Sequence, residues 1–245
     1  MTTSPSADTV AGDAKPLVSV VMPAFNAERY LREAIDSVLA QTHRPLELIV
    51  VDDGSTDATA QVMASYGARI IAVDGLENTG IGGARNRGLA EATGSFIAFM
   101  DADDIWPAEK LARQLQVFAA DPGLDLCFGH MQCFISPELP EAVKALRDCP
   151  PDPLPAPVAA TMLARRASFD RVGLFDPSLR VGEFIDWYAR ARDAGLRAHL
   201  EGDIFLMRRI HETNTGIIQR TAYRDYVRVA REALRRKMAA QPKGD

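Results

Sequence analysis

The stretch that decides the fold is Phe96-Ile97-Ala98-Phe99-Met100-Asp101-Ala102-Asp103-Asp104, in which an apolar run of strand length ends in three carboxylates. Carboxylates at the end of a buried strand are costly unless a positive group meets them. A divalent cation is the expected partner, because hard cations take oxygen ligands and bridge to phosphates. Open α/β sheets bind ligands at the carboxyl ends of their strands. The stretch therefore predicts a metal–diphosphate site at a sheet edge.

Two earlier segments repeat this design. Apolar runs at residues 17–22 and 46–51 lead into Pro23-Ala24-Phe25-Asn26 and Asp52-Asp53-Gly54-Ser55. Strand patterns alternate with helical ones, an order that predicts a parallel sheet with right-handed crossovers. The three polar segments should then meet at one edge of the sheet. Taken singly, the aspartates are also suited to capping the helices that follow them.

Composition narrows the function classes. The chain has 245 residues and a net charge of −5, so no basic excess indicates nucleic-acid binding. Its apolar runs are too short to span a membrane, and residues 1–15 lack the pattern of a signal peptide and predict a disordered tail. Three cysteines without a CxxC pair are typical of a reduced, cytoplasmic protein.

Four segments together carry a resemblance to a known family: residues 18–26, residues 50–57, Ala84-Arg85-Asn86 with Gly88, and residues 100–104. In combination they resemble the family 2 glycosyltransferases of the GT-A fold. The resemblance implies an α/β fold with a Rossmann-like, mostly parallel sheet flanked by helices and a smaller mixed C-terminal portion on the acceptor side. It implies one domain over residues 16–219, with residues 16–120 binding the nucleotide-sugar and 121–219 forming the acceptor half.

The resemblance also implies a nucleoside diphosphate sugar donor and a divalent metal, Mg²⁺ or Mn²⁺. Asp53 would accept from a base ring N–H, which favours uracil or thymine, and Asp101 would hold the ribose or sugar, or the metal through water. The donor-binding residues by this analogy are Pro23, Phe25, Asn26, Asp53, Arg85, Asp101 and Ala102. Asp103 would bind the metal directly, and His211 would contact the metal or the diphosphate, although a lone surface histidine is common. Arg208 and Arg209 beside it are candidate phosphate partners.

The general base is where this sequence departs from the family pattern, because Phe184 occupies the usual position of that carboxylate. Glu183 precedes it at a predicted helix start and is the first candidate. Asp186 lies within one turn and is the second candidate. Glu183 could instead only balance the helix dipole. If neither carboxylate serves, the acceptor could be a thiol or an already ionised group.

The sequence therefore predicts an inverting, metal-dependent hexosyltransferase that takes its sugar from a nucleoside diphosphate donor, most simply a UDP-sugar. Peptide, lipid-linked and small-molecule acceptors all stay open, as does a homodimer. One alternative is a catalytically silent nucleotide-sugar-binding protein, motivated by Phe184. Another is a sugar-phosphate nucleotidyltransferase, which would need a glycine-rich basic loop after the first strand that residues 23–26 do not provide.

Two segments of the second half have open roles. Residues 137–157 contain seven prolines and could form a mobile loop over a site or an idle surface excursion. Residues 220–245 predict a basic helix. It could touch an anionic partner or a membrane surface, although a solvated helical face is the favoured interpretation.

Overall fold

The computed structural model describes residues 15–75, 77–212, 214 and 223–240. The expected tail over residues 1–15 lies outside these ranges except for the exposed Lys15. The strands are β1 Val18–Ala24, β2 Leu46–Asp52, β3 Ile71–Asp74, β4 Phe96–Phe99, β5 Leu126–Ile135, β6 Leu154–Ala156, β7 Leu163–Arg165 and β8 Ala198–Ile210. The helices are α1 Leu31–Leu39, α2 Thr59–Ala64, α3 Gly80–Glu91, α4 Lys110–Ala120, α5 Glu141–Lys144, α6 Ala167–Val172, α7 Glu183–Asp193 and α9 Tyr223–Ala240, with short 3₁₀ turns at Gly67–Arg69 and Ala159–Thr161.

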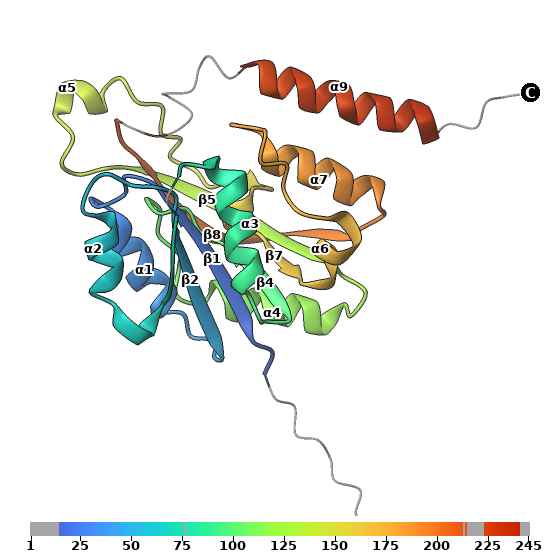
Figure 1. Ribbon diagram of the computed structural model, residues 1–245, viewed down its shortest axis with the longest axis horizontal. Coiled ribbons are helices and arrows are strands. Elements are labelled where there is room, and N and C mark those ends of the chain that lie inside the picture. Colours follow the sequence, from blue (N-terminus) through green and yellow to red (C-terminus); the bar gives the residue numbers. More distant parts are fainter. Residues whose placement is uncertain (1–14, 76, 213, 215–222, 241–245) are drawn as a thin grey trace, which may run out of the picture.

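One sheet runs through the centre of the molecule in the order β3-β2-β1-β4-β7-β5-β6, and β8 pairs with β5 (Figure 1). The pairs among β1, β2, β3 and β4 are parallel. Strand β7 runs antiparallel to β4 and β5, while β8 runs parallel to β5. The predicted mostly parallel sheet with a mixed C-terminal portion is confirmed.

Helices cover both faces of this sheet, as strands buried on both sides require. Alternate residues of β1 show the division: Val20 packs in a core with α1, α2 and α4, and Val21 packs in a second core with α3, α6 and α7. Each core is continuous along its face of the sheet. The loops at the carboxyl edge are therefore supported from both sides.

Strand β1 continues through Pro23 to Ala24, two residues further than the apolar run predicts. Proline lacks only a backbone donor. The pairing of β1 with β4 ends at Val21, whereas the pairing with β2 continues to Ala24. No residue of β4 is paired with Pro23, so no β4 carbonyl is left without a donor by the missing N–H of this proline.

Gly88 fixes how closely α3 approaches the sheet. A Cβ added at this position would lie 2.3 Å from Cγ1 of Val21, so only glycine allows the observed contact. This close approach brings the buried side chain of Arg85, one turn earlier on α3, to the carboxyl edge.

The predicted C-terminal helix is present as α9, which lies along the outer side of α7 (Figure 1). Residues 220–222 and 241–245 of that prediction lie outside the described ranges. No helix in the described ranges combines the length and hydropathy of a membrane span.

Candidate active site

The carboxyl ends of β1, β2 and β4 lie side by side, as the sequence predicts. Strand β1 sits between the other two, and Ala24 is in register with Asp52. The backbone N–H of Asp53 donates to the carbonyl of Ala24 at 2.8 Å, and that of Met100 donates to the carbonyl of Val21 at 3.0 Å. The polar segments that follow the three strands therefore share one edge.

Asp104 anchors the acidic loop after β4. Its side chain is buried, and its Oδ1 accepts from the backbone N–H of Arg209 at 2.8 Å. Burial raises the pKa of the Asp104 carboxyl well above its ordinary value, and the nearby charges of Asp103 and Asp101 raise it further. Asp104 thus holds the loop against β8 and leaves Asp103 at its surface.

Asp103 faces the end of β8. Its side chain is 32% exposed, and its Oδ2 lies 2.9 Å from Nε2 of the buried His211. Nδ2 of Asn214 lies 3.5 Å from the same oxygen. Oδ1 of Asn214 accepts from the backbone N–H of His211 at 2.7 Å, which holds the two β8-side groups together.

Asp103 and His211 fit a Mg²⁺ or Mn²⁺ ion. Adjacent ligands of an octahedral ion at about 2.1 Å lie about 3 Å apart, close to the observed 2.9 Å. No group of three or more His, Cys, Asp or Glu side chains in the described ranges is arranged to hold a metal. Such an ion needs only one or two protein ligands when phosphates and water complete its shell. These two residues would hold it.

Arg85 connects the acidic loop to α7. It donates from one terminal nitrogen to Oδ1 of Asp101 at 3.1 Å and from the other to Oε1 of Glu183 at 2.5 Å. The side chain is 3% exposed, and its Nε has no hydrogen-bond partner among the described residues. Burial raises the pKa of Asp101, while the charge of Arg85 opposes this rise. One cation thus compensates two site carboxylates.

The two candidate bases on helix α7 point to different partners. Glu183 begins the helix and points to Arg85, whereas Asp186 pairs with Nε of Arg190 at 2.9 Å and lies 3.6 Å from a terminal nitrogen of Arg236. Phe184 is buried in the core, where its ring stacks on Tyr188. The structure therefore brings Glu183 to the site and directs Asp186 toward two arginines.

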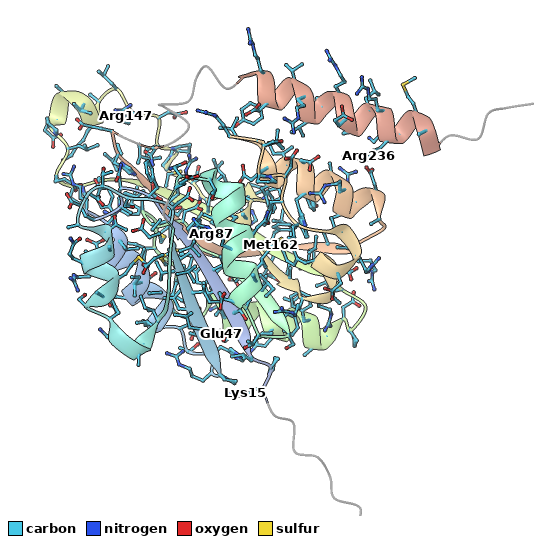
Figure 2. The ribbon with its side chains drawn as sticks, in the orientation of Figure 1. Lys15, Glu47, Arg87, Arg147, Met162 and Arg236 are labelled. Carbon is cyan, nitrogen blue, oxygen red and sulfur yellow. The ribbon has the colours of Figure 1, made fainter. Side chains whose placement is uncertain are left out.

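Asp53 is buried at the end of β2. Its Oδ1 accepts from the backbone N–H of Thr79 at 3.0 Å, from the Thr79 hydroxyl at 2.7 Å and from Arg87 at 2.6 Å. All three bonds use the same oxygen. Arg87, labelled in Figure 2, projects from α3 at this end of the sheet.

The other predicted donor-binding residues lie along the same edge but differ in exposure. Phe25 is 49% exposed, Pro23 is partly exposed and Ala102 is buried. Asn26 has a left-handed backbone with φ 49°, and its Oδ1 accepts from the backbone N–H of Thr56 at 2.9 Å. Asn26 thus ties the loop after β1 to the loop after β2.

Arg209 does not point to solvent as a phosphate partner would. It is 3% exposed, and its Nε donates to the carbonyl of Asp103 at 2.9 Å. Its guanidinium lies 4.6 Å from the ring centroid of Tyr30 and 4.7 Å from that of Phe134, and it pairs with Glu33 at 2.5 Å. Arg209 supports the acidic loop from behind.

Sequence reasoning missed three contributors to the site: Arg87, Asn214 and the supporting role of Arg209. Each acts through a contact with an aspartate at least 34 positions away. Arg87 lies beside the Ala84-Arg85-Asn86 group and follows Arg85 by two positions, which was the one available signal. No local pattern distinguishes Asn214 or a buried Arg209.

Comparisons with known proteins agree with this geometry. The model of glycosyl transferase family 2 matches residues 19–171. An uncharacterized glycosyltransferase of Rickettsia typhi is 31% identical over 224 residues, covering 85% of this chain and 69% of the relative. The UDP-Glc:alpha-D-GlcNAc-diphosphoundecaprenol beta-1,3-glucosyltransferase WfgD of Escherichia coli is 36% identical over 143 residues, covering 54% and 56%.

Solved structures share the fold. The mannosyltransferase PcManGT from Pyrobaculum calidifontis, in complex with GDP-Man and Mn²⁺, superposes with a TM-score of 0.69 at 22% identity. The match covers 95% of this chain and 67% of that one. The family match, the relatives and the shared fold lead to one conclusion: this chain belongs to glycosyl transferase family 2.

Proposed function

We propose that this glycosyltransferase moves a sugar from a UDP-sugar to its acceptor with inversion and depends on Mg²⁺ or Mn²⁺. The observation that carries the proposal is the pair of Asp103 and His211 beside the charge chain of Asp101, Arg85 and Glu183. The Asp103–His211 pair suits a metal ion bound to a diphosphate, and the chain of Asp101, Arg85 and Glu183 links the donor side to a candidate base.

The donor side is proposed to lie within residues 16–120. Exposed Phe25 and the neighbouring Pro23 offer an apolar surface to the nucleoside. Oδ2 of Asp53 has the capacity to accept from a base N–H, because the bonds from Thr79 and Arg87 all use Oδ1. Uracil presents such an N–H. The name of the WfgD relative specifies UDP-Glc, which supports the same donor base.

The acceptor side is proposed to lie within residues 121–219. Glu183 would take the proton from the acceptor nucleophile as general base, on the face opposite the departing diphosphate. The similarity to WfgD, whose name gives a diphosphoundecaprenol-linked acceptor, favours a lipid-linked acceptor for this chain.

Departure of the nucleoside diphosphate leaves negative charge on the β-phosphate. A bound Mg²⁺ or Mn²⁺ would stabilise that charge by direct coordination. Asp103 and His211 would position the diphosphate through it, while the Arg85 guanidinium contributes a fixed positive charge next to Asp101. Asp101 would also balance positive charge that develops on the sugar carbon.

The test is release of UDP from a panel of UDP-sugars, with GDP-sugars as the comparison, in the presence of Mn²⁺ or EDTA. The proposal expects turnover of a UDP-sugar with Mn²⁺, loss of turnover with EDTA, and loss in Asp103→Asn. Asp170→Asn on α6 is the matched control, because Asp170 is exposed and makes none of the site contacts described above. Turnover that is equal in EDTA would contradict the metal dependence.

One observation favours a second candidate, a silent nucleotide-sugar-binding protein. The Glu183 side chain is only 8% exposed, and its carboxylate lies 2.5 Å from a terminal nitrogen of Arg85, so it faces a guanidinium rather than an open acceptor position. This candidate expects metal-dependent binding of UDP without turnover of any UDP-sugar, even when lipid-linked and peptide acceptors are added.

A further inference from the structure

Helix α9 presents an apolar stripe that points away from the protein. Val227, Leu234 and Met238 are 52%, 60% and 66% exposed. Their spacings of seven and four residues place them on one face of the helix. Large apolar side chains gathered on an exposed helical face indicate a surface that meets another phase or partner.

Basic side chains flank this stripe. Arg224, Arg231 and Arg235 follow one border of the stripe at helical spacing and Lys237 lies on the other border, and all four are exposed. The chain as a whole carries a net charge of −5, so this face is a local positive region on an acidic protein. Exposed apolar residues bordered by arginine and lysine are the pattern of helices that lie in an anionic lipid surface.

The opposite face of α9 is fixed to the protein. Val229 is buried, and Nε of Arg236 pairs with Asp193 at 2.8 Å. Arg228 pairs with Asp176, and Asp225 accepts from the backbone N–H of Arg180 at 3.0 Å. Figure 2 shows the labelled Arg236 on the side of α9 that faces α7. These contacts set which face of the helix is turned outward.

The same helix lies over the start of α7. Gly182 has a φ of 80°, and a Cβ added there would lie 3.3 Å from the ring of Tyr226 on α9. The next residue is Glu183, the candidate base. A surface held against the outer face of α9 would therefore lie on the side of the molecule where the acceptor is proposed to enter.

We propose that the outer face of α9, defined as Val227, Leu234, Met238 and the four flanking basic residues, docks this enzyme on an anionic membrane surface. The stripe would insert among the lipid acyl chains near the headgroups, and the basic residues would neutralise headgroup charge. The link to the acceptor rests on the proposed function, whereas docking itself does not require turnover.

The experiment is flotation of the full chain with two kinds of vesicle. One is neutral phosphatidylcholine, and the other is phosphatidylcholine with about 30% phosphatidylglycerol, which gives a strongly anionic surface. The proposal expects binding to the anionic vesicles, weak binding to the neutral ones, and weakening by salt. Arg231→Gln with Arg235→Gln should lower the partition coefficient about 25-fold, at about fivefold per charge. Leu234→Ser with Met238→Ser should lower it about tenfold or more.

Matched controls change the same chemistry elsewhere. Arg32→Gln with Arg69→Gln removes two exposed charges near α2, and Leu146→Ser removes an 84% exposed apolar side chain beside α5. Circular dichroism checks that each variant keeps its fold, and UDP binding in solution separately checks the donor site. Anionic-vesicle binding with no UDP binding would leave the docking intact and defeat only the proposed function.

Three results would overturn the docking proposal. One is no binding to anionic vesicles by a chain whose circular dichroism shows it to be folded, whether or not it binds UDP. The second is equal loss of vesicle binding in the α9 variants and the matched controls. The third is concentration-dependent self-association in light scattering that Leu234→Ser abolishes, which would assign the face to a second copy of this chain.

Discussion

Nε2 of His211 lies 2.9 Å from Oδ2 of Asp103, although 108 positions separate the two residues. If both side chains bind one metal ion, removing the imidazole should weaken the binding of that ion. We predict that His211→Ala lowers Mn²⁺ affinity about 10-fold or more, because losing a direct ligand should cost at least as much as losing an outer-shell partner, which costs about 10–100-fold. Electron paramagnetic resonance titration of free Mn²⁺ measures it. His199→Ala, which changes an exposed histidine in β8, is the control, and equal affinities in the two variants would refute the assignment.

The two candidate bases can be separated by isosteric substitution. Glu183→Gln keeps the shape of the side chain beside Arg85 but removes its basicity. We predict a fall in kcat of about 10²–10⁴-fold with UDP binding retained, as loss of a general base requires. Asp186→Asn should change kcat far less, because its partners are Arg190 and Arg236. A larger effect at Asp186 would assign the base to that residue.

Arg209 is predicted to position the acidic loop. Arg209→Lys cannot keep both the bond to the Asp103 carbonyl and the contacts with Tyr30 and Phe134. We expect the free energy of unfolding to fall by about 1–3 kcal/mol and Mn²⁺ affinity to fall with it. Urea titration and the Mn²⁺ titration measure the two effects. Arg208→Lys serves as the neighbour control, and an unchanged stability in Arg209→Lys would contradict the role.

Lys110 is predicted to make stability depend on pH. It is fully buried, donates to Gln114 at 2.8 Å and lies 4.0 Å from the centroid of Trp106. Burial lowers the pKa of Lys110 to about 7, with a smaller opposing effect of Cys127. The unfolded chain, whose lysine titrates near 10.5, binds more protons between pH 7 and 10.5, so this group favours folding increasingly as pH rises through that window.

Comparison with Lys110→Met isolates the effect. The stability advantage of Lys110→Met over wild type should be largest below pH 7 and shrink by up to about 1.4 kcal/mol per pH unit above it. Urea titrations at about pH 6, below the window, and at about pH 8 and 9.5, within it, measure the difference. A difference that stays constant with pH would show that Lys110 keeps an ordinary pKa in the folded protein.

The donor half of the fold was predictable because its signals are local. Apolar runs of strand length end in Asp52-Asp53 and in Asp101-Ala102-Asp103-Asp104, and parallel topology alone brings these ends together. Helix boundaries were harder to predict from the sequence. Helix α3 begins at Gly80, where Asp53, 26 positions before Thr79, accepts from the backbone N–H and the hydroxyl of Thr79.

The second half of the site depends on tertiary contacts that no local pattern encodes. Asn214 and Arg209 look like ordinary polar residues until β8 is paired with β5 and placed against the acidic loop. The choice between Glu183 and Asp186 likewise needs the rotation of α7, which is set by the burial of Phe184 and Trp187. Contacts between elements far apart in the sequence, rather than periodicity, decide these positions.

The most direct test of the account is calorimetric titration of UDP into the wild type and into Asp103→Ala, each with Mn²⁺ and with EDTA. We predict that the wild type binds UDP much more tightly with Mn²⁺ than with EDTA, and that Asp103→Ala loses this difference. Equal UDP affinity under both conditions in the wild type, or an undiminished Mn²⁺ effect in Asp103→Ala, would contradict the metal–diphosphate site at the end of β4.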